Sequence, residues 1–134
     1  MKINSFYPVI MTEEVKNCAD FFIRYFDFQT TFEADWYISL MDENKNELAI
    51  LDYRHETVPS GFRAPLSGML LNIEVDNVDE VYEKLKQGLE RKILLDIKSE
   101  AFGQRHFIIE GPSKILIDVI QVIPPTEEYA ANYE

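Results

Sequence analysis

Two stretches of the chain share one apolar pattern, and this internal repeat is the feature that most constrains the fold. The stretch "VIMTEEVKNCADFF" (9–22) can be placed over "NIEVDNVDEVYEKL" (72–85). Apolar residues then fall on apolar residues: Ile10 on Ile73, Val15 on Val78, Cys18 on Val81, Ala19 on Tyr82 and Phe22 on Leu85. In both copies a strand pattern leads into apolar residues at helical spacing. Since 134 residues suffice for one compact domain, the repeat predicts a single domain, residues 1–134, made of two similar modules.

The first module, residues 1–64, begins with a predicted strand at 2–11, which is rich in β-branched and aromatic residues. A helix is expected next, because apolar side chains recur on one face: Val15, Cys18, Ala19, Phe22 and Phe26. Segments 30–42 and 46–53 predict further strands, joined by the turn-like "DENKN".

The second module, residues 65–134, repeats this order. A strand is predicted at 68–75, and Asn77 with Glu80 forms a plausible capping pair for the helix that follows. Three more strands are predicted at the end of the module: 91–100, 103–110 and 113–123. Each helix must bury its apolar stripe on one face of a sheet, which leaves the other face free. The pattern therefore predicts an α+β fold of two βαβββ modules.

The composition limits the partners of the protein. A formal net charge of −11 disfavours nucleic acid and anionic membrane surfaces. It permits a cationic ligand, although the acids can equally serve solubility alone. No apolar run approaches the roughly 20 residues that cross a bilayer, and the start of the chain lacks a signal-peptide pattern. The one cysteine, Cys18, excludes an internal disulfide and fits a reducing cytoplasm.

The doubled pattern, with "IEVDNVDEVYEKL" (73–85) and "EGPSKILIDVI" (110–120), resembles the vicinal oxygen chelate superfamily. This group includes glyoxalase I, extradiol dioxygenases, fosfomycin resistance enzymes and bleomycin resistance proteins. The resemblance implies that the modules pair into a curved mixed sheet that forms a cup, with the helices on its convex face, and that the protein is a homodimer. In the metal-dependent members, four ligands come from the first and last strand of each module and are usually His, Gln or Glu.

Carried onto this chain, the four ligand positions fall on Tyr7, Leu70, Leu51 (within 50–52) and Asp118. Leucine cannot bind a metal, and one carboxylate does not hold a divalent ion tightly. The resemblance, with its ligands mostly missing, therefore predicts no metal and no other cofactor. A divalent metal bound in an altered way stays the alternative.

Asp118 is unusual because it interrupts an apolar strand. It can be a metal ligand, half of an ion pair, or a polar residue at a wet sheet end. His55, His106 and Asp118 are the residue types of a two-His, one-carboxylate iron site. If 106–118 is a tight hairpin, however, His106 and Asp118 can lie opposite each other on one face, which favours an ion pair or hydrogen bond.

A base role for His106, oriented by Asp118, is chemically sensible. The sequence nevertheless carries no nucleophile elbow, phosphate loop or dinucleotide fingerprint beside it. Arg105 can meet an anionic ligand bidentately or pair with one of the 24 acids.

These considerations predict a small-molecule site lined by apolar and aromatic side chains with a few polar groups. The predicted ligand-binding residues are Tyr7, Trp36, Leu51, Leu70, Arg105, His106 and Asp118. The resemblance implies a metal-free binder of the bleomycin resistance type that sequesters a drug-like or cationic small organic molecule. The alternatives are a metal-dependent lyase, isomerase or dioxygenase of the same superfamily, and a structural or regulatory module whose cup is filled by its own side chains.

Overall fold

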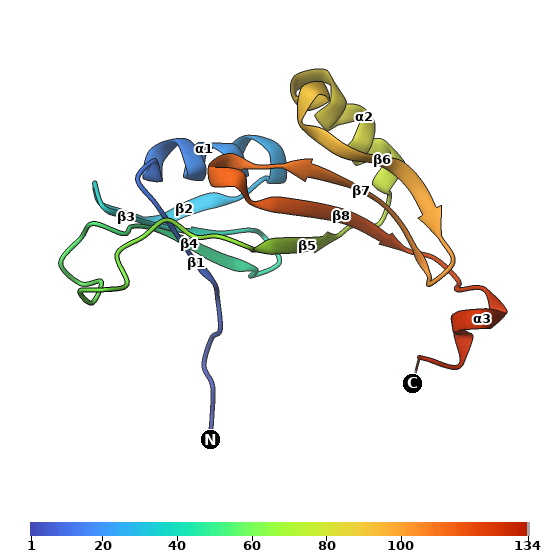
Figure 1. The fold of residues 1–134 in the computed structure, drawn as a ribbon, viewed down its shortest axis with the longest axis horizontal. Helices are drawn as coiled ribbons and strands as arrows, with labels where there is room; N and C mark the ends of the chain where they lie inside the picture. Colours follow the sequence, from blue (N-terminus) through green and yellow to red (C-terminus); the bar gives the residue numbers. More distant parts are fainter. Residues whose placement is uncertain (134) are drawn as a thin grey trace. The chain divides into compact units, whose positions relative to one another are not determined.

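The repeat in the sequence appears as two four-stranded sheets, one in each half of the chain (Figure 1). The structure is a computed structural model and describes residues 1–133. The chain divides into two units, Met1–Ser67 and Gly68–Glu134, close to the predicted boundary after residue 64. Each unit contains one βαβββ module, so the predicted fold class is confirmed.

In the first unit, one helix lies against a mixed sheet with strand order β1-β4-β3-β2. The elements are β1 (Val9–Thr12), α1 (Val15–Phe26), β2 (Gln29–Glu33), β3 (Tyr37–Met41) and β4 (Glu47–Asp52). Strand β1 pairs with β4 in parallel, whereas β2–β3 and β3–β4 are antiparallel. The α1 stripe is buried at Val15, Cys18, Ala19 and Phe22, and it faces the buried strand residues Ile10, Ile38, Leu40, Leu48 and Ile50.

Two predicted strand boundaries in this unit are wrong. Strand β1 begins only at Val9, because Pro8 has no N–H to donate to a ladder; its carbonyl still accepts from Ala49 N at 3.1 Å. The segment 30–42 holds two strands instead of one. A turn closed by Ala34 N donating to Tyr37 O at 2.8 Å separates them.

The second unit repeats the arrangement with strand order β5-β8-β7-β6. Its elements are β5 (Leu70–Glu74), α2 (Val78–Leu89), the short 3₁₀ helix η1 (Glu90–Lys92), β6 (Ile93–Glu100), β7 (Gln104–Glu110), the 3₁₀ turn η2 (Pro112–Lys114), β8 (Leu116–Val122) and α3 (Glu127–Ala130). Strand β5 is parallel to β8, and the other pairs are antiparallel. Figure 1 shows α2 on one face of this sheet and α3 at the C-terminal end of the chain.

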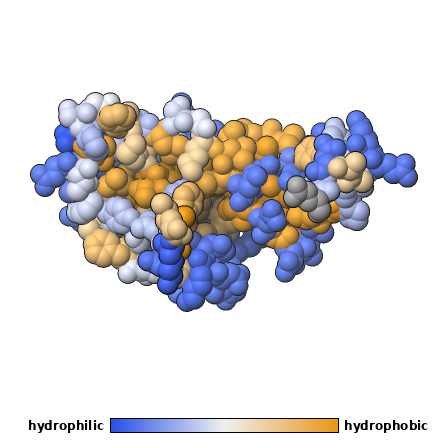
Figure 2. Space-filling view, turned by 90° about the horizontal axis from the view of Figure 1, so that it is seen from below, coloured by the Kyte–Doolittle hydropathy of each residue, from blue (hydrophilic) through white to orange (hydrophobic). Residues whose placement is uncertain are grey.

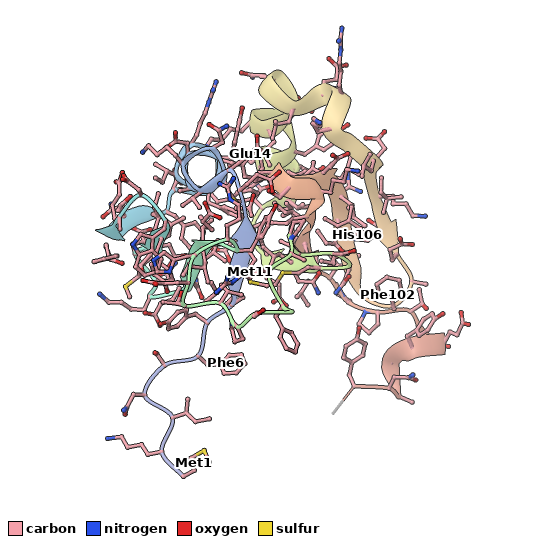
Figure 3. The ribbon with its side chains drawn as sticks, turned by 60° about the vertical axis from the view of Figure 1, so that its left-hand side comes forward. Met1, Phe6, Met11, Glu14, Phe102 and His106 are labelled. Atoms are coloured by element: carbon pink, nitrogen blue, oxygen red, sulfur yellow. The ribbon has the colours of Figure 1, made fainter. Side chains whose placement is uncertain are left out.

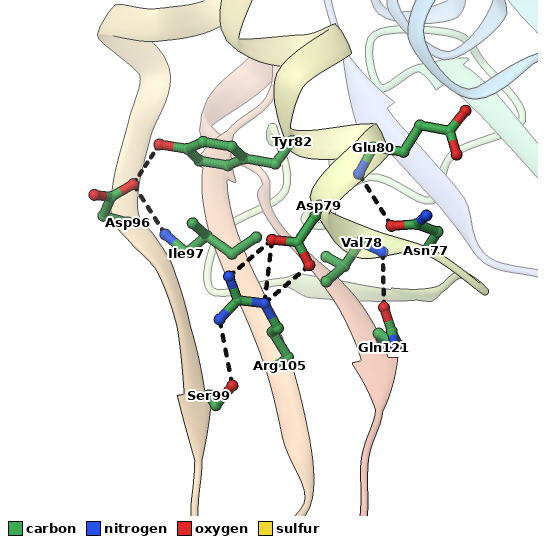
Figure 4. Close-up of polar contacts among 10 residues, drawn as sticks. All are labelled: Asn77, Val78, Asp79, Glu80, Tyr82, Asp96, Ile97, Ser99, Arg105 and Gln121. Atoms are coloured by element: carbon green, nitrogen blue, oxygen red, sulfur yellow. Dashed lines mark hydrogen bonds and ion pairs between the residues drawn. The ribbon is translucent and has the colours of Figure 1, made fainter.

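Helix α2 is held to its sheet by apolar packing and by polar contacts, which Figure 4 shows. The side chain of Asn77 accepts from Glu80 N at 3.2 Å, which confirms the predicted cap. At the same end, Val78 N donates to Gln121 Oε1 at 3.1 Å. The ring of Tyr82 packs edge-on against Phe107, with 5.2 Å between the ring centroids. These contacts fix α2 over the face that carries Phe107, Ile109, Ile117 and Val119, all fully buried.

Because side chains alternate along a strand, each sheet has a second face that does not meet its helix. In the second unit this helix-free face carries His106, Asp118 and their cross-strand neighbours. In the first unit it carries Tyr37 and Leu51, which are directly opposed in the β3–β4 register. Within residues 1–133, no helix is long and apolar enough to span a bilayer.

Candidate functional site

His106 lies between two carboxylates on the helix-free face of the second sheet. Its Nδ1 is 2.7 Å from Asp118 Oδ1, and its Nε2 is 2.9 Å from Glu100 Oε2. His106 is 5% exposed and Asp118 is 8% exposed. We call these three residues, Glu100, His106 and Asp118, the acid–imidazole cluster.

Three neighbouring strands bring the cluster together. His106 lies on β7 directly opposite Ile120, so Asp118 is its diagonal neighbour on β8. Glu100 ends β6 and is paired with Gln104, which shares the face of His106. The predicted pairing of His106 with Asp118 is thus present, but it is diagonal and not directly opposite.

The two carboxylates determine the protonation of the imidazole. Burial by itself would lower the pKa of His106, but the hydrogen bonds to Glu100 and Asp118 outweigh it and raise the pKa above its ordinary value of 6.5. The same bond from His106 is the main cause of a lowered pKa for Glu100. The outer end of the cluster is extended by Lys98, whose Nζ is 3.4 Å from Glu100 Oε1. The geometry therefore favours an imidazolium held between two carboxylates.

This arrangement does not suit a metal ion. A metal ligand must be a neutral imidazole with one nitrogen free, and both nitrogens of His106 are already hydrogen-bonded to carboxylates. Among residues 1–133, no three His, Cys, Asp or Glu side chains are grouped so that they could hold a metal. His55, the other histidine, lies in the first unit and hydrogen-bonds Thr57 through Nδ1 at 2.9 Å.

Apolar side chains surround the cluster on the same face. Leu70 begins β5 and is paired with Leu116. Both are exposed, as is Val122 at the end of β8. Figure 2 views the second unit from the side away from α2 and shows apolar surface with hydrophilic side chains among it. Asn72 is paired with Asp118 and adds an exposed amide to the polar row. The face thus combines a few polar groups with apolar surface, as small-molecule sites do.

Arg105 does not belong to this face. It lies on the helix side of β7, where Nη2 and Nε donate to Asp79 Oδ1 and Oδ2 at 2.7 and 3.0 Å (Figure 4). A further bond joins Nη1 to Ser99 Oγ at 3.3 Å. The structure therefore shows Arg105 in the alternative role considered above, as the partner of an acid, and does not group it with His106 and Asp118.

The remaining predicted site residues lie in the first unit. Leu51 is on the helix-free face of β4, opposite Tyr37. Tyr7 precedes β1, is 41% exposed, and has its pKa raised chiefly by the neighbouring charge of Tyr37. Trp36 lies just before β3, where its ring stacks on His55 at 3.7 Å between centroids and 8° between planes. Tyr7, Tyr37 and Leu51 thus belong to one aromatic and apolar region.

The register changes the residue that corresponds to Asp118 in the first unit. In the repeat, Val9 corresponds to Asn72. Val9 pairs with Ala49, whereas Asn72 pairs with Asp118. The counterpart of Asp118 is therefore Ala49, and the assignment of Leu51 to that position is wrong. The sequence could not identify the counterpart of Asp118, because the repeat alignment covered only the strand and helix that begin each module.

Sequence reasoning missed Glu100, and the predicted ligand-binding residues do not include Phe102, although it is one of the aromatic side chains expected either in the core or lining the site. Phe102 lies in the turn between β6 and β7, with its ring edge-on to His106 at 6.3 Å between centroids (Figure 3). The available signal was the short break between the strands predicted at 91–100 and 103–110. A tight turn there brings the end of one strand beside the start of the next, so Glu100 had to lie near Gln104 and His106.

Solved structures resemble this fold, although no family model and no curated protein matches the sequence. A glyoxalase/bleomycin resistance protein/dioxygenase family enzyme from Burkholderia phytofirmans PsJN aligns with a TM-score of 0.73 at 18% identity, covering 87% of this chain and 97% of that one. A glyoxalase/bleomycin resistance protein/dioxygenase from Nocardioides aligns with a TM-score of 0.75 at 12% identity, covering 92% and 85%.

A third similar structure is the lactoylglutathione lyase from Agrobacterium tumefaciens, with a TM-score of 0.67 at 12% identity, covering 90% of this chain and 95% of that one. At these identities the likeness concerns the fold alone. The chain therefore has the glyoxalase/bleomycin resistance/dioxygenase fold, and the resemblance to the vicinal oxygen chelate superfamily is confirmed at the level of the fold.

Proposed function

We propose that this protein binds a small organic molecule, drug-like or cationic, on the helix-free face of its second sheet without using a metal ion. The observation that carries the proposal is the engagement of both ring nitrogens of His106 by Glu100 and Asp118. Such a histidine contributes charge and hydrogen bonds to a site, whereas a metal centre needs several free donors.

The kind of ligand follows from charge and shape. Two carboxylates around one imidazolium give the cluster a formal charge of −1, which Lys98 beside Glu100 offsets, but the whole chain carries −11. Long-range attraction therefore favours a cation. The apolar residues of the helix-free face of the second sheet, Leu70 and Leu116 among them, suit a ligand with an apolar body. The cup and the homodimer that the resemblance implies remain predictions.

Fluorescence titration with two aromatic dyes of opposite charge tests this proposal. We expect the cation berberine to bind with saturable stoichiometry and the anion 8-anilinonaphthalene-1-sulfonate to bind at least about tenfold more weakly, which corresponds to 1.4 kcal/mol. Asp118→Asn should weaken berberine binding about tenfold, since a hydrogen bond to a charged group contributes about 1.5–3 kcal/mol. Asp79→Asn, on the opposite face of the sheet, is the matched control and should leave binding unchanged.

Metal analysis separates this function from the enzymatic alternative. Protein purified without chelator should carry zinc, iron or nickel at far less than one ion per chain, and chelator should not alter berberine binding. A stoichiometric metal that is lost in Asp118→Asn would instead support a metal-dependent lyase, isomerase or dioxygenase. Equal binding of both dyes, unaffected by Asp118→Asn, would refute the binding site proposed here.

A further inference from the structure

The turn between β6 and β7 is tied to the C-terminal segment by its backbone. Within the turn, Gly103 N donates to Glu100 O at 3.1 Å. The next three carbonyls all accept from the segment that follows β8. Thr126 N donates to Ala101 O at 2.9 Å, the Tyr133 hydroxyl donates to Phe102 O, and Ile123 N donates to Gly103 O at 2.9 Å. Hairpin turns usually leave such carbonyls to water, so this turn is held from outside.

The same turn carries the two side chains that cover the outer side of His106. The Glu100 carboxylate bonds His106 Nε2, and Phe102 packs edge-on against the imidazole. Phe102 also meets the ring of Tyr129 in the C-terminal segment, at 6.2 Å between centroids. Figure 3 shows Phe102 in the turn below His106. The C-terminal segment, the turn and the imidazole therefore form one continuous chain of contacts.

Gly103 shows how closely the segment approaches the turn. Its φ is +106°, a conformation that side chains rarely adopt. A Cβ at this position would lie 3.1 Å from Ile123 O, 3.2 Å from the Tyr133 hydroxyl and 3.4 Å from Pro125 Cβ. A methyl group here would be in tight contact with two oxygen atoms, so the neighbouring segment would have to shift by a few tenths of an ångström.

We propose that Ile123, Thr126 and Tyr133 form a clamp that positions Glu100 and Phe102 on His106 and so closes the Nε2 side of the imidazole. Asp118 holds the Nδ1 side from within the sheet, through β8, and does not depend on the clamp. Opening the clamp exposes Nε2 and leaves Nδ1 in place. Tyr133 is therefore a positioning residue, and the C-terminal segment sets access to the cluster. Only the identity of this cluster as a ligand site rests on the proposed function.

The two ring nitrogens of His106 provide the test, because only one of them faces the clamp. In ¹⁵N-edited NMR spectra of the full chain, both ring N–H protons should be observed and protected from exchange with water. In Tyr133→Phe we expect the Nε2 proton to exchange about tenfold faster, because the hydrogen bond from the Tyr133 hydroxyl to Phe102 O is lost. The Nδ1 proton should keep its rate. Gly103→Ala, which disturbs the contact from the turn side, should have the same selective effect.

Tyr25→Phe is the matched control, since it removes a tyrosine hydroxyl from α1 in the first unit and should change neither rate. The proposal is overturned if Tyr133→Phe and Gly103→Ala both leave the Nε2 rate unchanged. It is equally overturned if both ring protons accelerate together, which indicates general opening, or if Nε2 is unprotected in the unchanged protein. Dye binding plays no part in this measurement, so the clamp and the proposed function can fail independently.

Discussion

Substitution of His106 by glutamine removes the cation on which two buried or half-buried carboxylates depend. Breaking a buried pair by removing one partner costs about 3–5 kcal/mol of unfolding free energy. We expect the lower end, about 3 kcal/mol, because the two acids are not equally buried. The Glu100 side chain is 22% exposed and can turn to water, whereas the Asp118 side chain is 11% exposed and loses its charged partner His106.

The same substitution should change how stability depends on pH. Burial opposes the charge on His106, but the bonds to Glu100 and Asp118 raise its pKa above 6.5. The imidazolium therefore stabilises the fold fully below pH 6.5, and this contribution is lost as the pH rises through the raised pKa. The slope cannot exceed about 1.4 kcal/mol per pH unit for one proton. Glu100, whose pKa His106 lowers, contributes in the opposite sense, above its ordinary value of 4.5.

Urea unfolding followed by far-ultraviolet circular dichroism, from about pH 5.5 to about pH 9, measures both effects. The unchanged protein should lose unfolding free energy between pH 6.5 and the raised pKa, and His106→Gln should be less stable with a flatter profile. His55→Gln is the matched control because these are the only two histidines. If the unchanged protein shows no fall above pH 6.5, or if His106→Gln keeps it, the assignment of an imidazolium between two acids is refuted.

Three further substitutions test the second unit, each by urea unfolding. Asn77→Ala removes the cap on Glu80 N and should cost about 1 kcal/mol; no loss would mean that water caps the helix equally well. Phe107→Ala empties a fully buried site and should cost about 3–5 kcal/mol; a loss below about 1 kcal/mol would contradict its place in the core. Asp79→Asn breaks the ion pair with Arg105 and should cost less than about 1 kcal/mol, because the Asp79 side chain is 57% exposed; a larger loss would contradict its classification as a surface pair.

The sequence predicted the modules well because each βαβββ unit depends on local patterns. The α1 and α2 stripes and the Asn77 cap could be read from spacing alone. Strand β1 was misplaced where Pro8 interrupts hydrogen bonding. Local composition gave the strand tendency of residues 2–11 but did not show where a ladder could start.

The candidate site was harder to predict because it depends on register. A tight hairpin over 106–118 predicts His106 and Asp118 on one face, and the structure places them there. Strand alternation puts the consecutive residues Arg105 and His106 on opposite faces of the sheet. The prediction that both bind one ligand is inconsistent with this alternation. The short break between the predicted strands could have placed Glu100 near His106, but the C-terminal segment that holds this turn could not be predicted. Contacts between segments that are far apart in sequence do not follow from periodicity.

Two separate features of residues 1–133 support the proposal of a metal-free site, one from the sequence and one from the geometry. The sequence argument assigned Leu51 to the ligand position that corresponds to Asp118, whereas the strand register assigns Ala49 to it. Neither side chain can coordinate a metal. The second feature is geometric. Removing Glu100 would free Nε2 of His106, but Asp118 is bound to the other nitrogen and lies on the opposite side of the ring. A metal at Nε2 would then have one donor from the cluster, and zinc needs three or four.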